Sequence, residues 1–173
     1  RAVDWRLVDE IVAAPKLDEI VAARAKEFAA RSDRPSGVSG IALTPLAKKW
    51  TGDTCEYRSV TVAIDRAARL ATITLRGPDL PPPASLVEME KLGAEFWPLR
   101  LARELDDAIL DLRSNEGDIA VIVFKSEGDP AQVLAYDAFL DANISNWLAR
   151  EISLYWKRVL KRVDLTSRSL VAI

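Results

Sequence analysis

The sequence predicts an α/β fold, because strand and helix signals follow one another between residues 57 and 124. Residues 60–65 and 71–75 alternate apolar and polar or small side chains, which is the period of strands with one buried face. Residues 99–113 carry apolar side chains at helical spacing. The run 119–124 is apolar throughout, as expected of a strand covered on both faces.

The composition is that of an ordinary globular protein: 173 residues, 49% hydrophobic and 29% charged, with a formal net charge of −2. The chain lacks the excess of basic residues that would indicate a nucleic-acid partner. No apolar run approaches the roughly 20 residues that cross a bilayer. The chain has no histidine, which excludes Ser-His-Asp and Cys-His catalysis within it. The single cysteine excludes an intrachain disulfide and suits a reducing, cytoplasmic location.

The N-terminal residues predict the end of a helix, a bend at Arg6 and a short strand over 7–12. A helix follows from Leu17 to about Arg31, with two acidic residues in its first turn, where the helix dipole favours them. Because the chain opens inside a helix end and stops at Ile173 within an apolar run, we expect an internal piece of a longer polypeptide.

Residues 32–56 predict a linker, since proline and glycine punctuate them and long structureless loops within one domain are uncommon. One helical turn is expected over 46–50. The linker is therefore the predicted boundary between an N-terminal unit, 1–31, and a second unit, 57–173.

Within the second unit, residues 66–69 connect the two strands as a hairpin, and Gly77-Pro78 ends the second strand. Ser85 is the expected N-cap of a short helix over 86–92, with Glu88 completing a capping box. Helix 99–113 follows, and Gly117 is the expected left-handed end of it. Its apolar stripe consists of Ala102, Leu105, Ile109 and Leu112, with Arg103, Glu104, Asp107 and Asp111 off the stripe.

After strand 119–124 we expect a polar turn over 125–130 and an apolar stretch over 131–140. The longest helix begins at Asn143 or Ser145 and runs to about Val163, and a last strand covers 170–173. The apolar stripe of that helix is Leu148, Ile152, Tyr155 and Val159, widened by Trp147, Trp156 and Leu160.

Charged clusters are the first candidate sites. A buried carboxylate pair can serve as general acid and base, but we interpret the acidic residues as a solvated helix face. Four cations near the end of the longest helix are either a phosphate clamp or charges that stabilise a helix C-terminus, and we favour the latter. The acids are Glu88, Glu90, Glu95, Glu104, Asp106, Asp107 and Asp111; the cations are Lys157, Arg158, Lys161 and Arg162.

Three further candidates remain. Phe96, Trp97 and Trp147 either stack on an aromatic ligand or belong to the core, which we favour. Cys55 is interpreted as an inert thiol in the linker. Residues 127–137 predict a loop after a buried strand, where open α/β sheets bind ligands and where a backbone N–H can face an oxyanion.

Three stretches share the order strand, helix and strand: Ala71-Thr-Ile-Thr-Leu-Arg-Gly-Pro78, Glu104-Leu-Asp-Asp-Ala-Ile109 and Ala120-Val-Ile-Val-Phe-Lys-Ser-Glu-Gly128. They resemble the start of a unit of the crotonase (enoyl-CoA hydratase/isomerase) superfamily. Ser167-Arg-Ser-Leu-Val-Ala-Ile173 resembles the strand before the second oxyanion loop. Residues 1–12 with helix 17–30 are similar to the end of a unit. The resemblance thus implies an incomplete crotonase-like fold of ββα units: the tail of one unit and the head of a second.

The amino-acid sequences of residues 97–109 and 165–170 are similar to those of ring-opening lyases within that superfamily. This resemblance implies a cytoplasmic enzyme, in the form of a homodimer, that opens an oxygenated, dearomatised benzoyl-CoA with water, giving a CoA semialdehyde and formate. No metal or redox cofactor is implied; the ligand is the CoA thioester itself. An ordinary enoyl-CoA hydratase or isomerase, and a purely structural packing or dimerisation domain, remain the alternatives.

The resemblance also locates the chemistry. The family's first oxyanion loop ends in a small-Gly-Ala-Asp pattern, which aligns with Leu134-Ala-Tyr-Asp137 and puts Tyr136 at the donor position as the one oxyanion-loop candidate. Arg6 replaces the glycine usual in its bend, so a strained backbone is expected there. The family's catalytic glutamates fall outside these residues, so we expect no catalytic, cofactor-binding or metal-binding residue in this segment.

Overall fold

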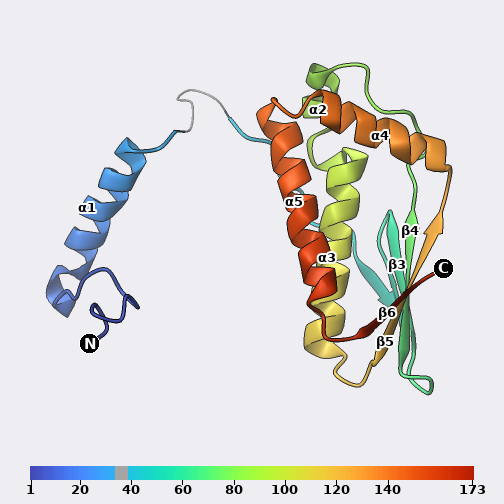
Figure 1. Cartoon of the computed structure of the whole chain (residues 1–173), viewed down its shortest axis with the longest axis horizontal. Coiled ribbons are helices and arrows are strands. Elements are labelled where there is room, and N and C mark those ends of the chain that lie inside the picture. The colour runs from blue at the N-terminus through green and yellow to red at the C-terminus, as the bar shows by residue number, and fades with distance from the viewer. Residues whose placement is uncertain (34–38) are drawn as a thin grey trace. The chain divides into compact units, whose positions relative to one another are not determined.

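The computed structural model describes residues 1–33 and 39–173 and contains two compact units, Arg1–Gly40 and Ile41–Ile173 (Figure 1). Part of the expected linker, residues 34–38, lies outside the described residues. The two units are described separately.

The first unit begins with a tight turn that closes as a helix end does. Leu7 donates its N–H to the carbonyl of Ala2 at 2.9 Å, and Arg6 donates to Val3 at 2.9 Å. This pair of bonds is the Schellman pattern, which requires a left-handed residue after the last helical turn. Arg6 occupies that position with φ 55°, so the predicted bend and its strained backbone are confirmed.

The strand predicted over 7–12 is wrong, because these residues are irregular and pair with no strand among the described residues. Leu7 and Ile11 are 71% and 76% exposed, so these apolar side chains are not buried as those of a strand in a sheet would be. A 3-10 turn, Ala14–Lys16, leads into α1 (Leu17–Ala30), which confirms the predicted helix. No residue of α1 is buried.

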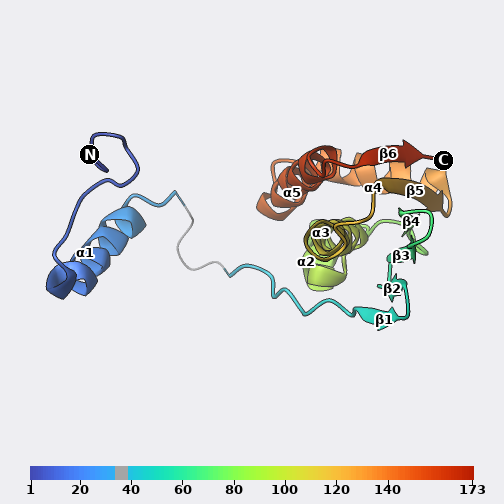
Figure 2. The same cartoon turned by 90° about the horizontal axis from the view of Figure 1, so that it is seen from below.

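The second unit is built on a six-stranded mixed sheet whose spatial order follows the chain, from β1 to β6 (Figure 2). The first four strands are antiparallel, whereas β4, β5 and β6 are parallel to one another. The α/β class and the predicted hairpin are therefore confirmed. The strands are β1 (Lys49–Thr51), β2 (Thr54–Glu56), β3 (Val60–Asp65), β4 (Leu70–Arg76), β5 (Val121–Glu127) and β6 (Ser169–Ala172).

The first two strands lie inside the stretch expected to be a linker. Trp50 pairs with Cys55 and Thr51 with Thr54, so Gly52-Asp53 is a two-residue hairpin loop, with Gly52 at φ 58°. The helical turn predicted over 46–50 is wrong, because β1 already begins there and pairs with β2. A Gly-Asp dipeptide between two short polar-apolar runs is a hairpin signal.

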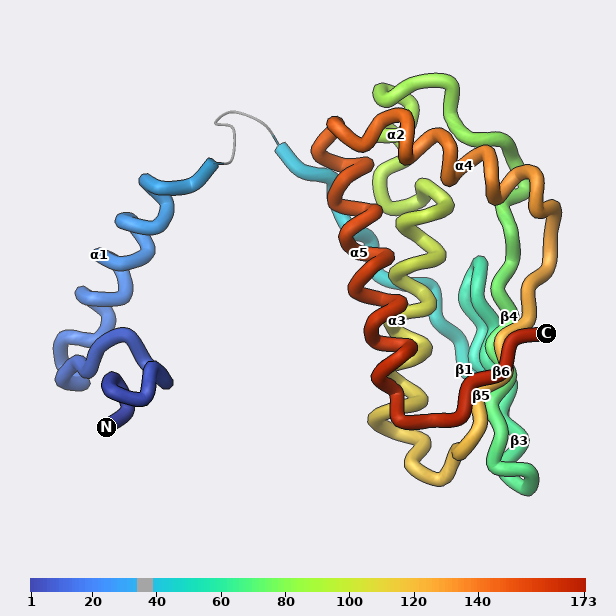
Figure 3. Tube along the Cα trace, in the orientation of Figure 1, coloured from blue at the N-terminus to red at the C-terminus, as the bar shows by residue number. Residues whose placement is uncertain are grey.

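Four helices complete the second unit: α2 (Leu86–Leu92), α3 (Trp97–Asn115), α4 (Pro130–Ala142) and α5 (Trp147–Asp164). The tube in Figure 3 shows α3, which returns the chain from β4 to β5, lying beside α5, which leads to β6. Both lie on one face of the sheet, and no described helix covers the other (Figure 2). The prediction that β5 is covered on both faces is therefore wrong, because residues 121 and 123 are only partly buried.

The helix ends follow local capping chemistry. The Ser85 Oγ accepts the N–H of Glu88, as predicted, while the Glu88 carboxylate accepts the N–H of Ala84 rather than that of Ser85. Gly117 does not have a positive φ, so its predicted left-handed role is wrong; the preceding residue ends α3. Asn146 caps α5 by accepting two backbone N–H groups. At 18 residues α5 is one shorter than α3, so it is not the longest helix.

The core lies in two connected places. Between the sheet and helices α3 and α5, the predicted stripe of α3 meets the inward residues of β3, β4 and β5. A second cluster gathers the starts of α3 and α5 with α2 and α4. Its members include Met89, Phe96, Tyr136, Leu148 and Ile152. Trp147 and Leu160 are exposed, so they do not widen the stripe of α5 as predicted.

Candidate functional site

The carboxyl ends of the parallel strands β4 and β5 meet at a pair of glycines. Gly77 donates its N–H to the carbonyl of Glu127 at 2.7 Å. Gly128 has φ 119°, and a Cβ on it would lie 3.0 Å from the Cα of Gly77. Only glycine fits this backbone crossing, because a φ of 119° strains a residue that carries a Cβ and the crossing leaves no room for a side chain. The edge is where open α/β sheets bind ligands.

A pocket of about 450 Å³ opens at this edge, and we call it the strand-end pocket. Its apolar lining comes from the end of β4, the start of α3 and the first turns of α4. Its polar lining comes from the glycine crossing and its neighbours. The apolar residues are Leu75, Trp97, Leu101, Pro130, Val133 and Leu134; the others are Arg76, Gly77, Ser126, Glu127, Gly128 and Asp129.

The loop predicted over 127–137 is short, which corrects the sequence expectation. Asp129 is the N-cap of α4 and accepts the N–H of Ala131 at 2.9 Å, and Pro130 is the first helical residue. An N-cap aspartate followed by proline is a strong helix start. This signal was present in the sequence, and it explains why only residues 128 and 129 separate β5 from α4.

Tyr136, the oxyanion-loop candidate, lies in the middle of α4. At the seventh helical position its N–H is beyond the first four, which alone lack an intrahelical acceptor. Its side chain is 5% exposed, and its ring centroid lies 5.5 Å from that of Phe96 and 5.3 Å from that of Trp97. The hydroxyl donates to the carbonyl of Pro81 at 3.3 Å, and burial raises the pKa of Tyr136. These contacts make Tyr136 an aromatic core residue.

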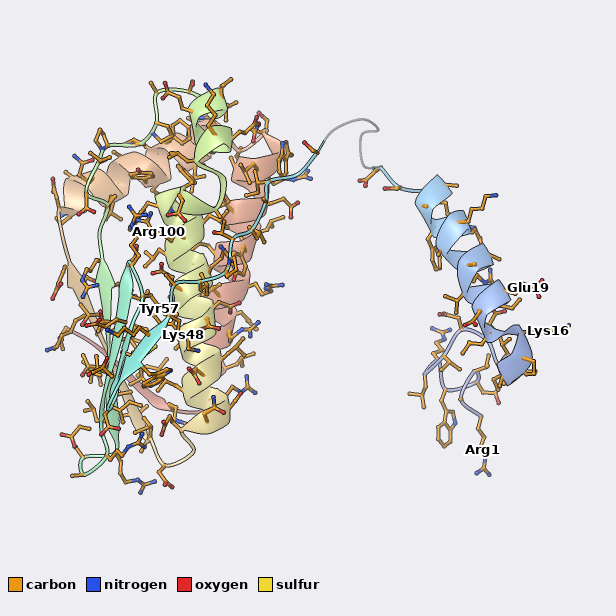
Figure 4. The ribbon with its side chains drawn as sticks, turned by 180° about the vertical axis from the view of Figure 1, so that it is seen from behind. Arg1, Lys16, Glu19, Lys48, Tyr57 and Arg100 are labelled. Carbon is orange, nitrogen blue, oxygen red and sulfur yellow. The ribbon has the colours of Figure 1, made fainter. Side chains whose placement is uncertain are left out.

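A second pocket, of about 520 Å³, lies under the proline-rich segment 78–83, and we call it the proline-loop pocket. Trp97 and Tyr136 line it with charged residues of both signs. Arg58 pairs with Glu95 at 2.8 Å, and the partly buried Arg100 donates to the hydroxyl of Ser59 at 3.0 Å (Arg100 is labelled in Figure 4). Its cations are thus largely engaged by neighbouring groups. The charged lining residues are Arg58, Lys91, Arg100, Asp79, Glu88 and Glu95.

Glu104 is the acidic residue that contradicts most clearly the interpretation of the acids as a solvated helix face. It is 4% exposed, and its carboxylate accepts the N–H of Ser59 at 2.6 Å. Burial raises the pKa of Glu104, and hydrogen bonds from the backbone of 58–60 oppose that rise. The carboxylate therefore fixes the turn before β3, which places Arg58 at the proline-loop pocket.

Asp106 is also buried and joins α3 to α5. Its carboxylate lies 2.8 Å from the Nε of Arg162 and accepts the hydroxyl of Tyr155 at 3.0 Å. Burial and the nearby carboxylate raise the pKa of Tyr155 to about 12. The guanidinium of Arg158 lies 4.9 Å from the ring of the same tyrosine. Two of the four predicted cations thus have structural partners within the helix pair.

Lys48 anchors the segment before β1 on α3. Its ammonium lies 3.0 Å from the carboxylate of Asp107 and 2.7 Å from that of Asp111. Burial disfavours its charge, but the two carboxylates outweigh burial and raise the pKa of Lys48. Tyr57 donates to Asp107 at 2.6 Å, and Figure 4 shows Lys48 and Tyr57 next to one another. Burial, followed by this carboxylate, raises the pKa of Tyr57.

Cys55 lies beneath this cluster in β2 and is 1% exposed. Burial raises the pKa of its thiol, which confirms an inert cysteine and corrects its placement in an exposed linker. Phe96 and Trp97 belong to the core as predicted, whereas Trp147 is 39% exposed on the first turn of α5.

The remaining acids have local partners. The Glu88 carboxylate accepts the N–H of Ala84, just before α2, and Glu90 accepts from the side-chain amide of Asn146 at 3.5 Å.

Across residues 1–33 and 39–173, no three His, Cys, Asp or Glu side chains are grouped closely enough to hold a metal ion. Over the same residues, no helix combines the length and apolar character needed to cross a membrane.

The fold and these contacts define a mixed α/β unit with two pockets at one end of its sheet. No protein-family model matches the chain. Over all 173 residues it is 43% identical to the benzoyl-CoA-dihydrodiol lyase of Aromatoleum evansii. The chain spans only 31% of the length of that lyase.

Proposed function

We propose that this chain is a segment of a ring-opening lyase of the crotonase superfamily that acts on an oxygenated, dearomatised benzoyl-CoA. The observation that carries the proposal is the 43% identity to a benzoyl-CoA-dihydrodiol lyase, which extends over every residue of the chain. The superfamily resemblance of the strand, helix and strand stretches between 71 and 128 supports it. In this proposal the whole protein is cytoplasmic and homodimeric, binds the CoA thioester, and uses no metal or redox cofactor.

Within such a lyase we propose that these residues serve packing and pocket closure while the chemistry lies elsewhere in the protein. Residues 1–31 would end one crotonase-like unit, and the sheet and helices from β1 onward would begin a second. Two contacts support a non-catalytic role. Tyr136 has its N–H inside α4 and its hydroxyl on the carbonyl of Pro81, and Glu104 is bound to the turn that precedes β3.

The experiment is an assay of the longer protein that carries this chain. With the oxygenated, dearomatised benzoyl-CoA we expect release of formate in water without added metal or redox cofactor. Hydration of an ordinary enoyl-CoA ester without formate release would contradict the proposal and favour the hydratase alternative.

A further inference from the structure

We propose that the strand-end pocket binds a small ring compound that carries no negative charge, as a ligand and not as a substrate. The proposal concerns a binding site only, and it holds or fails whether or not the protein is a lyase. It is carried by the shape of the pocket, by its apolar walls and by the charges at its rim.

The walls favour an apolar ring. Leu101 is buried, and Leu75 and Trp97 are partly buried, so they form a fixed apolar floor. Val133 and Leu134, from the first turns of α4, are 37% and 67% exposed, and a bound ring would remove their surfaces from water. A volume of about 450 Å³ lies within the range of small-molecule sites.

The rim disfavours an anion. Glu127 and Asp129 place two carboxylates there, and the one cation of the lining, Arg76, is already engaged. Its guanidinium donates to the hydroxyl of Thr61 at 2.8 Å and lies 3.8 Å from the carboxylate of Glu127. The N-terminus of α4 does not offer an anion-binding site either, because the carboxylate of Asp129 already accepts the N–H of Ala131 there.

Trp97 lines both the strand-end pocket and the proline-loop pocket, so it forms the wall between them. Its indole N–H donates to the carbonyl of Arg76 at 3.1 Å, and its ring packs on the buried Tyr136. The wall between the pockets is therefore held by a hydrogen bond and by aromatic packing. This separation keeps the ligand away from the cations of the proline-loop pocket.

The test compares two probes of nearly equal size, benzyl alcohol and benzoate, on the folded 173-residue chain. Binding is followed by backbone amide shifts in two-dimensional NMR. We expect saturable binding of benzyl alcohol with shifts concentrated over residues 126–134, and at least about tenfold weaker binding of benzoate. Equal affinity for the two probes, or no saturable binding of benzyl alcohol, would overturn the proposal.

A variant pair locates the site. Val133→Trp places a bulky ring in the pocket mouth on an exposed helix position, and it should weaken benzyl alcohol binding by about tenfold or more. Val87→Trp, on the exposed face of α2 and outside the lining of both pockets, should leave the affinity unchanged. If Val133→Trp binds as the unaltered chain does, the ligand lies elsewhere and the assignment is wrong.

Discussion

The glycine crossing at the ends of β4 and β5 gives the sharpest test of the structure. Gly128→Ala forces an L-residue to φ 119°, a backbone conformation that only glycine adopts without strain. This strain should lower the free energy of unfolding by about 1–3 kcal/mol. The new Cβ would also lie 3.0 Å from the Cα of Gly77 and 3.1 Å from its nitrogen. These are backbone atoms, and the bond from Gly77 to Glu127 holds them in place. We therefore expect a total loss of about 3 kcal/mol or more in the free energy of unfolding.

Gly117→Ala is the matched control. Gly117 has no positive φ, and a Cβ there meets nothing within 4 Å. Its substitution should change stability by no more than about 1 kcal/mol, in the stabilising direction where the backbone suits alanine. Urea unfolding followed by far-ultraviolet circular dichroism measures both variants. If Gly128→Ala is as stable as Gly117→Ala, the described crossing of the two strands is wrong.

Three further predictions concern buried polar groups. All three tyrosines have raised pKa values, so the absorbance at 295 nm should rise at a higher pH in the folded chain than in urea. The same midpoint in both conditions would contradict the burial of the tyrosines. Because the pKa of Glu104 is raised by burial, its protonated form stabilises the fold fully below the ordinary glutamate pKa, and this stabilisation is lost as the pH rises through the raised value. The stability of the unaltered chain relative to Glu104→Gln should thus increase as pH falls from 7, and a constant difference in urea unfolding would refute this. Asp106→Asn leaves Arg162 without its counter-charge and should lower the free energy of unfolding by about 1–3 kcal/mol. The double variant Asp106→Leu with Arg162→Met removes both partners and should lower the free energy of unfolding by less than Asp106→Asn does. An equal or greater loss in the double variant would count against a coupled pair.

Periodicity was sufficient for the central elements. The alternation of β3 and β4 and the stripe of α3 depend on one buried face, so their residues carry the pattern directly. The strand predicted over 7–12 was based on a short apolar and acidic run without alternation, and a strand also needs a partner, of which none lies among the described residues. The hairpin of β1 and β2 was missed because three-residue strands are too short for a period to appear.

The site was harder to predict than the fold. Residues 131–140 are apolar on most sides, so α4 shows little periodicity, and its start was visible only in the Asp129-Pro130 pair. Glu104 lies at a helical position that spacing alone assigns to the surface. It is buried because the turn at 58–60 folds over it and donates to its carboxylate. Such burial depends on a contact between residues 45 positions apart, which no local pattern encodes.

The central proposal is that these residues belong to a ring-opening lyase but do not carry its chemistry. Two samples test it with the same oxygenated, dearomatised benzoyl-CoA: the longer protein and the 173-residue chain alone, the latter first shown to be folded by circular dichroism. We predict formate release from the longer protein and none from the chain. Formate release from the chain alone would contradict the account.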